Sequence, residues 1–183
     1  WSRPERRPVL PLGAEGDGDE CMAHFWRSGI VELSDGTWGC PYAAFSVIHD
    51  CPPEKLSKLF PSRQSQQIRW ARWHPNRFCG IRADTEASFS IPSLFRANDE
   101  LHLNYRCDPG GWIQIELMEK LPSLMFPDAD PLPGFTFDDC DRLTGEKDDQ
   151  VVTWKGQSDI SAAGDAVGIR VRMLGAKLFA YRV

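Results

Sequence analysis

The sequence lacks the long apolar run that a transmembrane helix requires. A helical membrane span needs about 20 consecutive apolar residues, and no stretch of this 183-residue chain approaches that length. The first residues, WSRPERRP, contain neither a Met nor an apolar segment, so they match neither a start site nor a signal peptide. We therefore expect a soluble chain with no membrane partner, and a sequence that begins inside a longer protein.

Clusters of basic residues are also missing, which argues against a nucleic-acid partner. The chain has 21 Lys and Arg against 26 Asp and Glu, a formal net charge of −5. Seven Asp and one Glu fall within residues 128–149, opposed only by Arg142 and Lys147, so the rest of the chain is close to neutral. Because phosphate binding depends on clustered Lys and Arg, we predict that the protein does not bind nucleic acid.

The sequence has no CxxC pair and no glycine-rich phosphate loop, which are the usual signatures of zinc ribbons, thiol redox sites and nucleotide-binding loops. Its six cysteines lie 11 to 33 residues apart, at positions 21, 40, 51, 79, 107 and 140. An even number permits disulfides, but a chain of this length does not need them to fold, and unpaired cysteines are commonly buried. Unpaired core thiols are the favoured interpretation, and the redox compartment stays open.

The acidic segment 128–149 carries a weak signal for calcium. Calcium prefers clustered carboxylates and carbonyls, but the segment lacks the Asp-x-Asp-x-Asp-Gly loop with a closing Glu. Turns in which Asp side chains accept hydrogen bonds from nearby backbone N–H groups explain the composition more simply. We therefore expect no cofactor and no metal site, with calcium as the alternative.

What the sequence does contain is the two-residue alternation of β-strands. Asp35-Gly36 lies between apolar runs, which is a strong hairpin signal. From residue 86 onward, six or seven short strands are predicted with turn residues between them and no helical period. They are residues 87–91, 100–106, 112–118, 135–138, 151–154, 169–174 and 177–183. This density is typical of an antiparallel β-sandwich, so the predicted fold class is all-β.

The two parts of the chain differ in the number of strands that they supply. Residues 84–183 have enough strands to close a two-layer core, whereas residues 1–83 have about four and cannot bury both faces of one small sheet. We therefore predict β-hairpins in residues 1–83 that need a neighbouring domain, and a β-sandwich domain in residues 84–183. The predicted core of that domain is Leu101, Leu103, Ile113, Ile115, Val152, Trp154, Val171 and Phe179.

Several motifs point to a known family. They are PGFTFDDCDRLTG at 133–145, VTWKGQSDI at 152–160 and KLFAYRV at 177–183, with WSRP at 1–4, RPVLPLG at 7–13 and GIVELSDGTW at 29–38 upstream. The C-terminal motifs resemble the terminal, lectin-like β-sandwich of bacterial proteins related to the invertase and levanase-like glycoside hydrolases. The upstream motifs resemble the last blade of the five-bladed β-propeller that precedes this sandwich in the family.

The resemblance implies an upstream propeller domain as a partner, but it brings no catalytic residue into this chain. In the family, the catalytic carboxylates come from the early propeller blades, which have no counterpart in this sequence. Asp138, Asp139 and Asp141 could suggest the carboxylate pair of glycoside hydrolysis, but neighbouring strand residues point to opposite faces. We predict no catalytic residue here; any glycoside hydrolysis would belong to the parent protein.

Polar and apolar side chains alternate on residues 100–106 and 112–117, on either side of the CDPGG sequence at 107–111. If this sequence forms a turn, the two segments make a hairpin with one shared polar face. A sugar needs an aromatic plane for its C–H side and planar polar groups for its paired hydroxyls. The predicted carbohydrate-binding residues on this face are His102, Asn104, Arg106, Trp112, Gln114 and Glu116, joined by Arg170 and Arg172.

Two other interpretations of this face stay open. It is also typical of the plain solvent-exposed face of an antiparallel sheet, or of a surface that packs against the propeller. The predicted function is a non-catalytic module that binds an oligo- or polysaccharide within a carbohydrate-active protein. The alternative is a structural domain that buttresses a propeller glycosidase. A glycan partner slightly favours an extracellular or periplasmic location and leaves a cytoplasmic one open.

Overall fold

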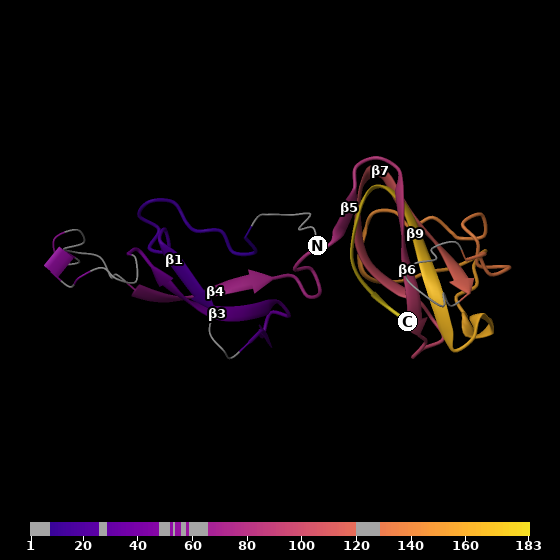
Figure 1. The fold of residues 1–183 in the computed structure, drawn as a ribbon, viewed down its shortest axis with the longest axis horizontal. Coiled ribbons are helices and arrows are strands. Elements are labelled where there is room, and N and C mark those ends of the chain that lie inside the picture. Colours follow the sequence, from indigo (N-terminus) through magenta and orange to yellow (C-terminus); the bar gives the residue numbers. More distant parts are fainter. Residues whose placement is uncertain are drawn as a thin grey trace. The chain divides into compact units, whose positions relative to one another are not determined.

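In the computed structural model, the chain is all-β and sandwich-like with two antiparallel sheets, which confirms the predicted fold class (Figure 1). The structure describes residues 8–25, 29–47, 66–119 and 129–183, with Pro52, Glu54, Lys55 and Lys58 between them. Contacts divide the chain into two units, Trp1–Phe78 and Cys79–Val183. This division comes slightly before the boundary predicted at residue 84, because residues 81–83 pair with the C-terminal strand of the second unit.

The first unit contains one small sheet built around a central hairpin strand. This strand, β3 (Trp38–Phe45), pairs along one edge with β4 (Gln66–Trp73) and along the other with β1 (Met22–Phe25) and β2 (Val31–Glu32). The β2–β3 connection is the predicted Asp-Gly turn, where Gly36 has a φ of 78° and its N–H donates to the Leu33 carbonyl. β1 and β2 share one edge of β3, so the sheet is only three strands wide.

Among the residues that the structure describes, one face of this sheet has a core. Tyr42, Ala44 and Ala71 are buried on it. On the opposite face, Ile68 and Trp70 keep 66% and 48% of their surface exposed. This agrees with the expectation that a sheet of this width cannot bury both of its faces by itself.

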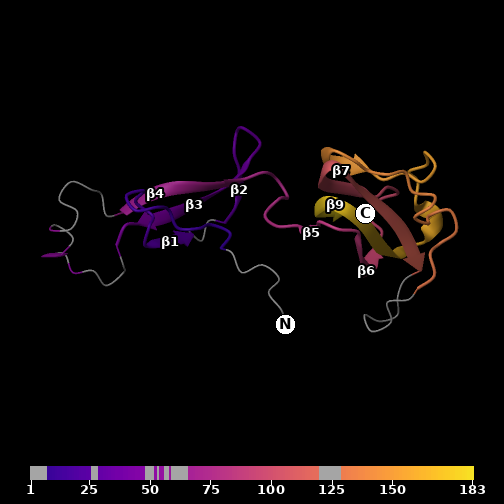
Figure 2. The ribbon, with the colours of Figure 1, turned by 90° about the horizontal axis from the view of Figure 1, so that it is seen from above.

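The second unit contains a five-stranded sheet dominated by two long strands. Its strands are β5 (Ile81–Ala83), β6 (Ala87–Phe95), β7 (His102–Glu119), β8 (Glu146–Val151) and β9 (Ala166–Arg182). β5 and β6 follow each other along one edge of β9, and β7 pairs with the other edge (Figure 2). β8 pairs with the free edge of β7. A short 3-10 turn, Ser161–Ala163, precedes β9.

The glycine-rich segment 107–111 is a bulge within β7 and not the predicted turn. The pairing of β7 with β9 shifts register between Cys107 and Trp112 but continues on both sides. A Cβ on Gly111 would lie 2.2 Å from the Gly175 carbonyl oxygen, so only glycine permits this close approach of the two backbones. The hairpin prediction is therefore wrong. Because pairing continues across the bulge, the strands predicted at 100–106 and 112–118 form the single strand β7. The strands predicted at 169–174 and 177–183 likewise form the single strand β9.

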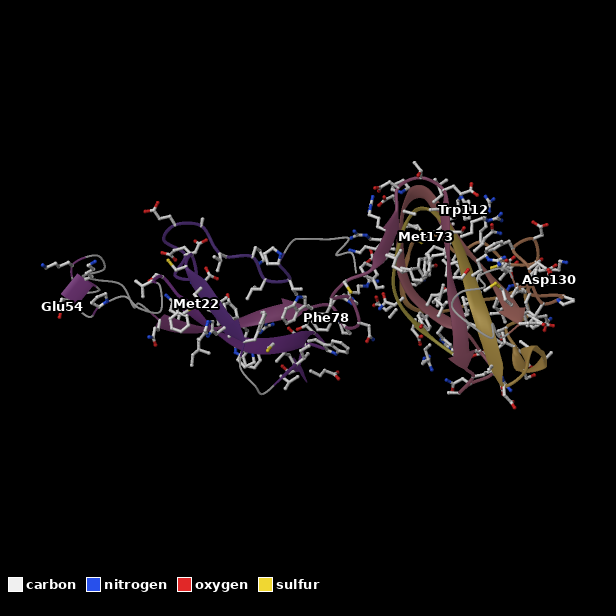
Figure 3. All side chains as sticks on the ribbon, in the orientation of Figure 1. Met22, Glu54, Phe78, Trp112, Asp130 and Met173 are labelled. Carbon is white, nitrogen blue, oxygen red and sulfur yellow. The ribbon has the colours of Figure 1, made fainter. Side chains whose placement is uncertain are left out.

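The inward-facing side chains of β7 and β9 form one apolar core. Its members include Leu103, Tyr105, Ile113, Ile115, Leu117, Ile169, Val171 and Met173, together with Leu101, Val152, Trp154 and Ile160 from the connections. Every predicted core residue except Phe179 is buried; Phe179 is half-buried. Figure 3 labels Trp112 and Met173, which lie on neighbouring strands beside the bulge.

The segment 129–143 runs beside β7 but does not form a regular strand. Backbone bridges join it to β7 at Pro131 and Leu143, opposite Met118 and Ile113. Between these bridges the segment leaves the sheet in a series of turns, so the strand predicted at 135–138 is wrong. It returns through Cys140, whose Sγ accepts the Ile115 N–H at 3.2 Å. The segment therefore covers part of the sheet while staying attached to its edge.

Candidate functional site

Five of the predicted carbohydrate-binding residues do come together, on the outer face of β7 and β9. Gln114 lies opposite Arg172, and Glu116 lies opposite Arg170. Trp112, Gln114 and Glu116 are, however, only 8%, 7% and 5% exposed. The prediction that these residues form an open polar face is therefore wrong, because the arginines and the segment 129–143 cover them.

The polar groups under this cover bind one another and the backbone of the segment. Gln114 donates from Nε2 to the carbonyls of Phe137 at 2.9 Å and Cys140 at 3.1 Å, and its Oε1 accepts from Arg172 at 3.0 Å. Glu116 forms an ion pair with Arg170. Buried polar and charged groups need such partners. Gln114 and Arg170 therefore attach the segment 129–143 to the sheet, and among the described residues the buried Arg172 Nε has no hydrogen-bond partner.

Aromatic rings and guanidinium groups alternate beside this network. The guanidinium of Arg142 lies 4.6 Å from the centroid of the Trp112 ring, and that of Arg172 lies 5.7 Å from it. Arg172 also lies 4.4 Å from the Phe137 ring. These distances fall within the range of cation–π contacts. Trp112 is thus a support for two cations and does not offer an open plane for a sugar ring.

The other three predicted site residues lie on β7 before the bulge and have separate surroundings. Asn104 is buried and Arg106 is exposed. His102 has Nδ1 2.9 Å from Asp149 and Nε2 3.4 Å from Glu100. Hydrogen bonds from Arg182 hold the pKa of the Asp149 carboxyl below its ordinary value. His102 also lines a cavity of about 400 Å³ with residues 98–100, Ser158, Asp159 and Arg182.

A second cavity lies at the bulge, and we call it the Trp112 groove. It has a volume of about 430 Å³ and is lined by residues 107–112 together with Arg142, Thr144 and Gly145. Asp108 is its one carboxylate, and Arg82 binds this group at 2.8 Å. Arg142 has no ion-pair or hydrogen-bond partner within the described part of the chain. The groove therefore contains one charged group without a partner of opposite charge among the described residues, the Arg142 guanidinium.

The thiol at the base of the groove is not activated. Burial raises the pKa of Cys107 to about 11, and burial raises that of Cys140 to about 11 as well. Both side chains are therefore protonated at neutral pH, whereas a nucleophilic cysteine needs a lowered pKa. Cys21, Cys40 and Cys79 are also free thiols; Cys51 lies outside the described residues.

Two carboxylates of the acidic motif within residues 138–141 accept hydrogen bonds from Thr136 and from the turn at residues 153–156. Asp139 accepts from Thr136 and Lys155, and Asp141 accepts from Thr153 at 2.6 Å and from the Gly156 N–H at 2.8 Å. These bonds lower the pKa of both carboxyls. Among the residues that the structure describes, no three His, Cys, Asp or Glu side chains converge as metal ligands. Asp139 stabilises the turn that begins at Thr136, as the turn interpretation of the acidic segment predicted, whereas Asp141 accepts from groups 12 and 15 residues away.

Sequence reasoning missed Asp108, Arg142 and Thr144 as groove residues. Asp108 was assigned to a turn, and the other two lie in a segment without strand periodicity. One signal was available, since Arg142 is one of only two basic residues in the acidic segment 128–149. Its position opposite Trp112 depends on the path of the segment across β7, which no local pattern specifies.

Comparison with protein-family models, curated proteins and solved structures gives no match. The resemblance to the propeller hydrolases is therefore supported only by the sequence motifs described above. Within the described residues, no helix is long and apolar enough to cross a membrane.

Proposed function

We propose that the second unit, Cys79–Val183, is a non-catalytic carbohydrate-binding module and that its ligand occupies the Trp112 groove. The observation that carries the proposal is the groove itself. Its volume lies in the range of small-molecule sites, roughly 300–1,000 Å³, and its lining combines an indole with a guanidinium, a hydroxyl and a carboxylate. Planar and hydroxyl groups of this kind bind the paired hydroxyls of sugars.

Binding without hydrolysis agrees with the charges in the groove. Most glycoside hydrolysis takes two carboxyl groups on either side of the scissile bond. Asp108 is the only carboxylate among the residues that line the groove, and Arg82 holds it in an ion pair. We therefore assign hydrolysis, if it occurs, to other parts of a carbohydrate-active parent protein resembling the propeller hydrolases.

A structural role is the second candidate, and the first unit favours it. Ile68 and Trp70 form an exposed apolar surface on the face of the sheet without a core. Burial of such a surface against another domain is favourable by about 25 cal/mol per Å² of apolar area. In this proposal, residues 1–83 pack against an upstream propeller domain, and the second unit buttresses it.

A glycan array followed by calorimetric titration of the full chain tests the first proposal. The Arg142→Ala variant removes an exposed groove residue and is expected to weaken glycan binding at least tenfold without changing the melting temperature. Arg106→Ala is the control, since Arg106 is also an exposed arginine and lies on β7 outside the groove. If no glycan binds the unaltered chain, the structural role replaces the binding role.

A further inference from the structure

We infer that the Trp112 groove selects glycans whose sugars carry carboxylate groups, and that Arg142 recognises this group. The inference rests on the proposed function of the same groove and specifies its ligand class.

Most of the arginines in this region already have polar partners. Arg170 forms an ion pair with Glu116, Arg172 donates to Gln114, and Arg82 binds Asp108. Arg142 differs from these three, because its guanidinium contacts the Trp112 ring but no acceptor among the residues that the structure describes. Its N–H donors are therefore available to a ligand.

The acidic residues close to Arg142 in the sequence bind other groups. The adjacent Asp141 accepts from Thr153 and from the Gly156 N–H, and Asp139 is bound by Lys155. Neither carboxylate is directed to the guanidinium. The segment 128–149 contains seven Asp, yet among its described residues none forms an ion pair with Arg142. A bound carboxylate would supply this counter-ion.

The shape of the Arg142 guanidinium suits a carboxylate ligand. A guanidinium presents its N–H groups in a planar fork that matches the two oxygens of a carboxylate. The contact with Trp112 restricts where the Arg142 side chain lies before a ligand arrives, which reduces the entropy lost on binding. Trp112 is therefore a positioning residue, and Arg142 is the group that contacts the ligand.

The test measures the affinity of the full chain for uronic-acid oligosaccharides and for their neutral methyl esters. The probes are galacturonate, glucuronate and mannuronate oligomers, titrated by calorimetry at low and at moderate salt. At least one acid oligomer is expected to bind at least about tenfold more tightly than its ester, which is the range of a charge-assisted hydrogen bond. Added salt should reduce this preference.

Substitution of the arginine separates charge recognition from general binding. Arg142→Gln is expected to lower the affinity for the acid oligomer to that for the ester, while the affinity for the ester changes little. Arg106→Gln should leave both affinities unchanged. Circular dichroism melting of each variant confirms that it is folded.

Each other result overturns the inference in a recognisable way. Equal affinity for acid and ester, unaffected by Arg142→Gln, rejects carboxylate selection but leaves glycan binding intact. Dextran sulfate that binds as tightly as the acid oligomer shows attraction to any polyanion. Failure of all probes and of a neutral glycan array rejects both this inference and the proposed function.

Discussion

Trp154 donates its indole N–H to the backbone carbonyl of Ile115 at 3.0 Å. The Ile115 N–H is bound by the Cys140 thiol, so side chains occupy both hydrogen-bonding groups of this buried strand residue. In a regular sheet, the backbone of a neighbouring strand would do this. Trp154 and Cys140 thus have a structural role, because they complete the hydrogen bonding of the sheet where the segment 129–143 leaves it.

The first prediction concerns Trp154→Phe. Phenylalanine preserves most of the apolar contact but leaves the Ile115 carbonyl without its donor, so the free energy of unfolding should fall by at least about 1–3 kcal/mol. Urea unfolding measures this change. Tyr181→Phe serves as an aromatic control in the same unit, because Tyr181 is 41% exposed and should change stability by less than about 0.5 kcal/mol. Equal effects of the two substitutions would contradict the role of the indole N–H.

A second prediction concerns Trp112→Ala. Because Trp112 is only 8% exposed and supports two guanidinium groups, its truncation should cost roughly 3–5 kcal/mol of stability. Thermal or urea unfolding tests this. A loss below about 1 kcal/mol would indicate an open aromatic platform, as the sequence alone suggested.

The third prediction concerns alkaline pH. Burial raises the pKa of Cys107 and Cys140 from 9.0 to about 11, so the folded state favours the protonated thiols. Their contribution to stability is fully present below pH 9 and is lost as the pH rises from about 9 to about 11. In a variant with both cysteines replaced by alanine, the free energy of unfolding should fall less between pH 9 and pH 11, as measured by urea unfolding at a series of pH values. An unchanged pH slope would show that these thiols do not titrate differently in the two states.

A fourth prediction concerns the unit boundary. Residues 79–183 expressed alone should fold, since they contain all five strands of their sheet and its core. A fragment of residues 84–183 lacks β5, which covers part of the β9 edge, and should be folded but less stable. Amide dispersion and urea unfolding compare the two fragments. If residues 79–183 are unfolded while the full chain is folded, the second unit depends on the first.

Local patterns predicted the parts of the fold that depend on local chemistry. Alternation indicated β-strands, the Asp-Gly pair marked the β2–β3 turn, and buried positions such as Leu103 and Ile115 followed from the strand period. The CDPGG sequence at 107–111 was wrongly predicted to be a turn, because proline and glycine are common both in turns and in bulges. The choice between them came from pairing with β9, more than 60 residues further along the chain.

The candidate site was less predictable, because its residues are positioned by an irregular segment. Strand alternation correctly grouped Gln114, Glu116 and Trp112 on one face. It did not indicate that the segment 129–143 would cover them, since a polar face under a loop has the same pattern as one in water. The buried position of Gln114 becomes apparent only from the backbone carbonyls that it binds.

The location of β8 has a consequence for self-association. β8 is the outermost strand of its sheet in the strand order, and an outer strand can recruit the strand of another molecule. Its sequence, EKDDQV, places charge at four of six positions. A second copy pairing along this edge would bring like carboxylates close together. The acidic side chains of β8 within the segment 128–149 thus disfavour the growth of intermolecular sheets and fibrils along this edge.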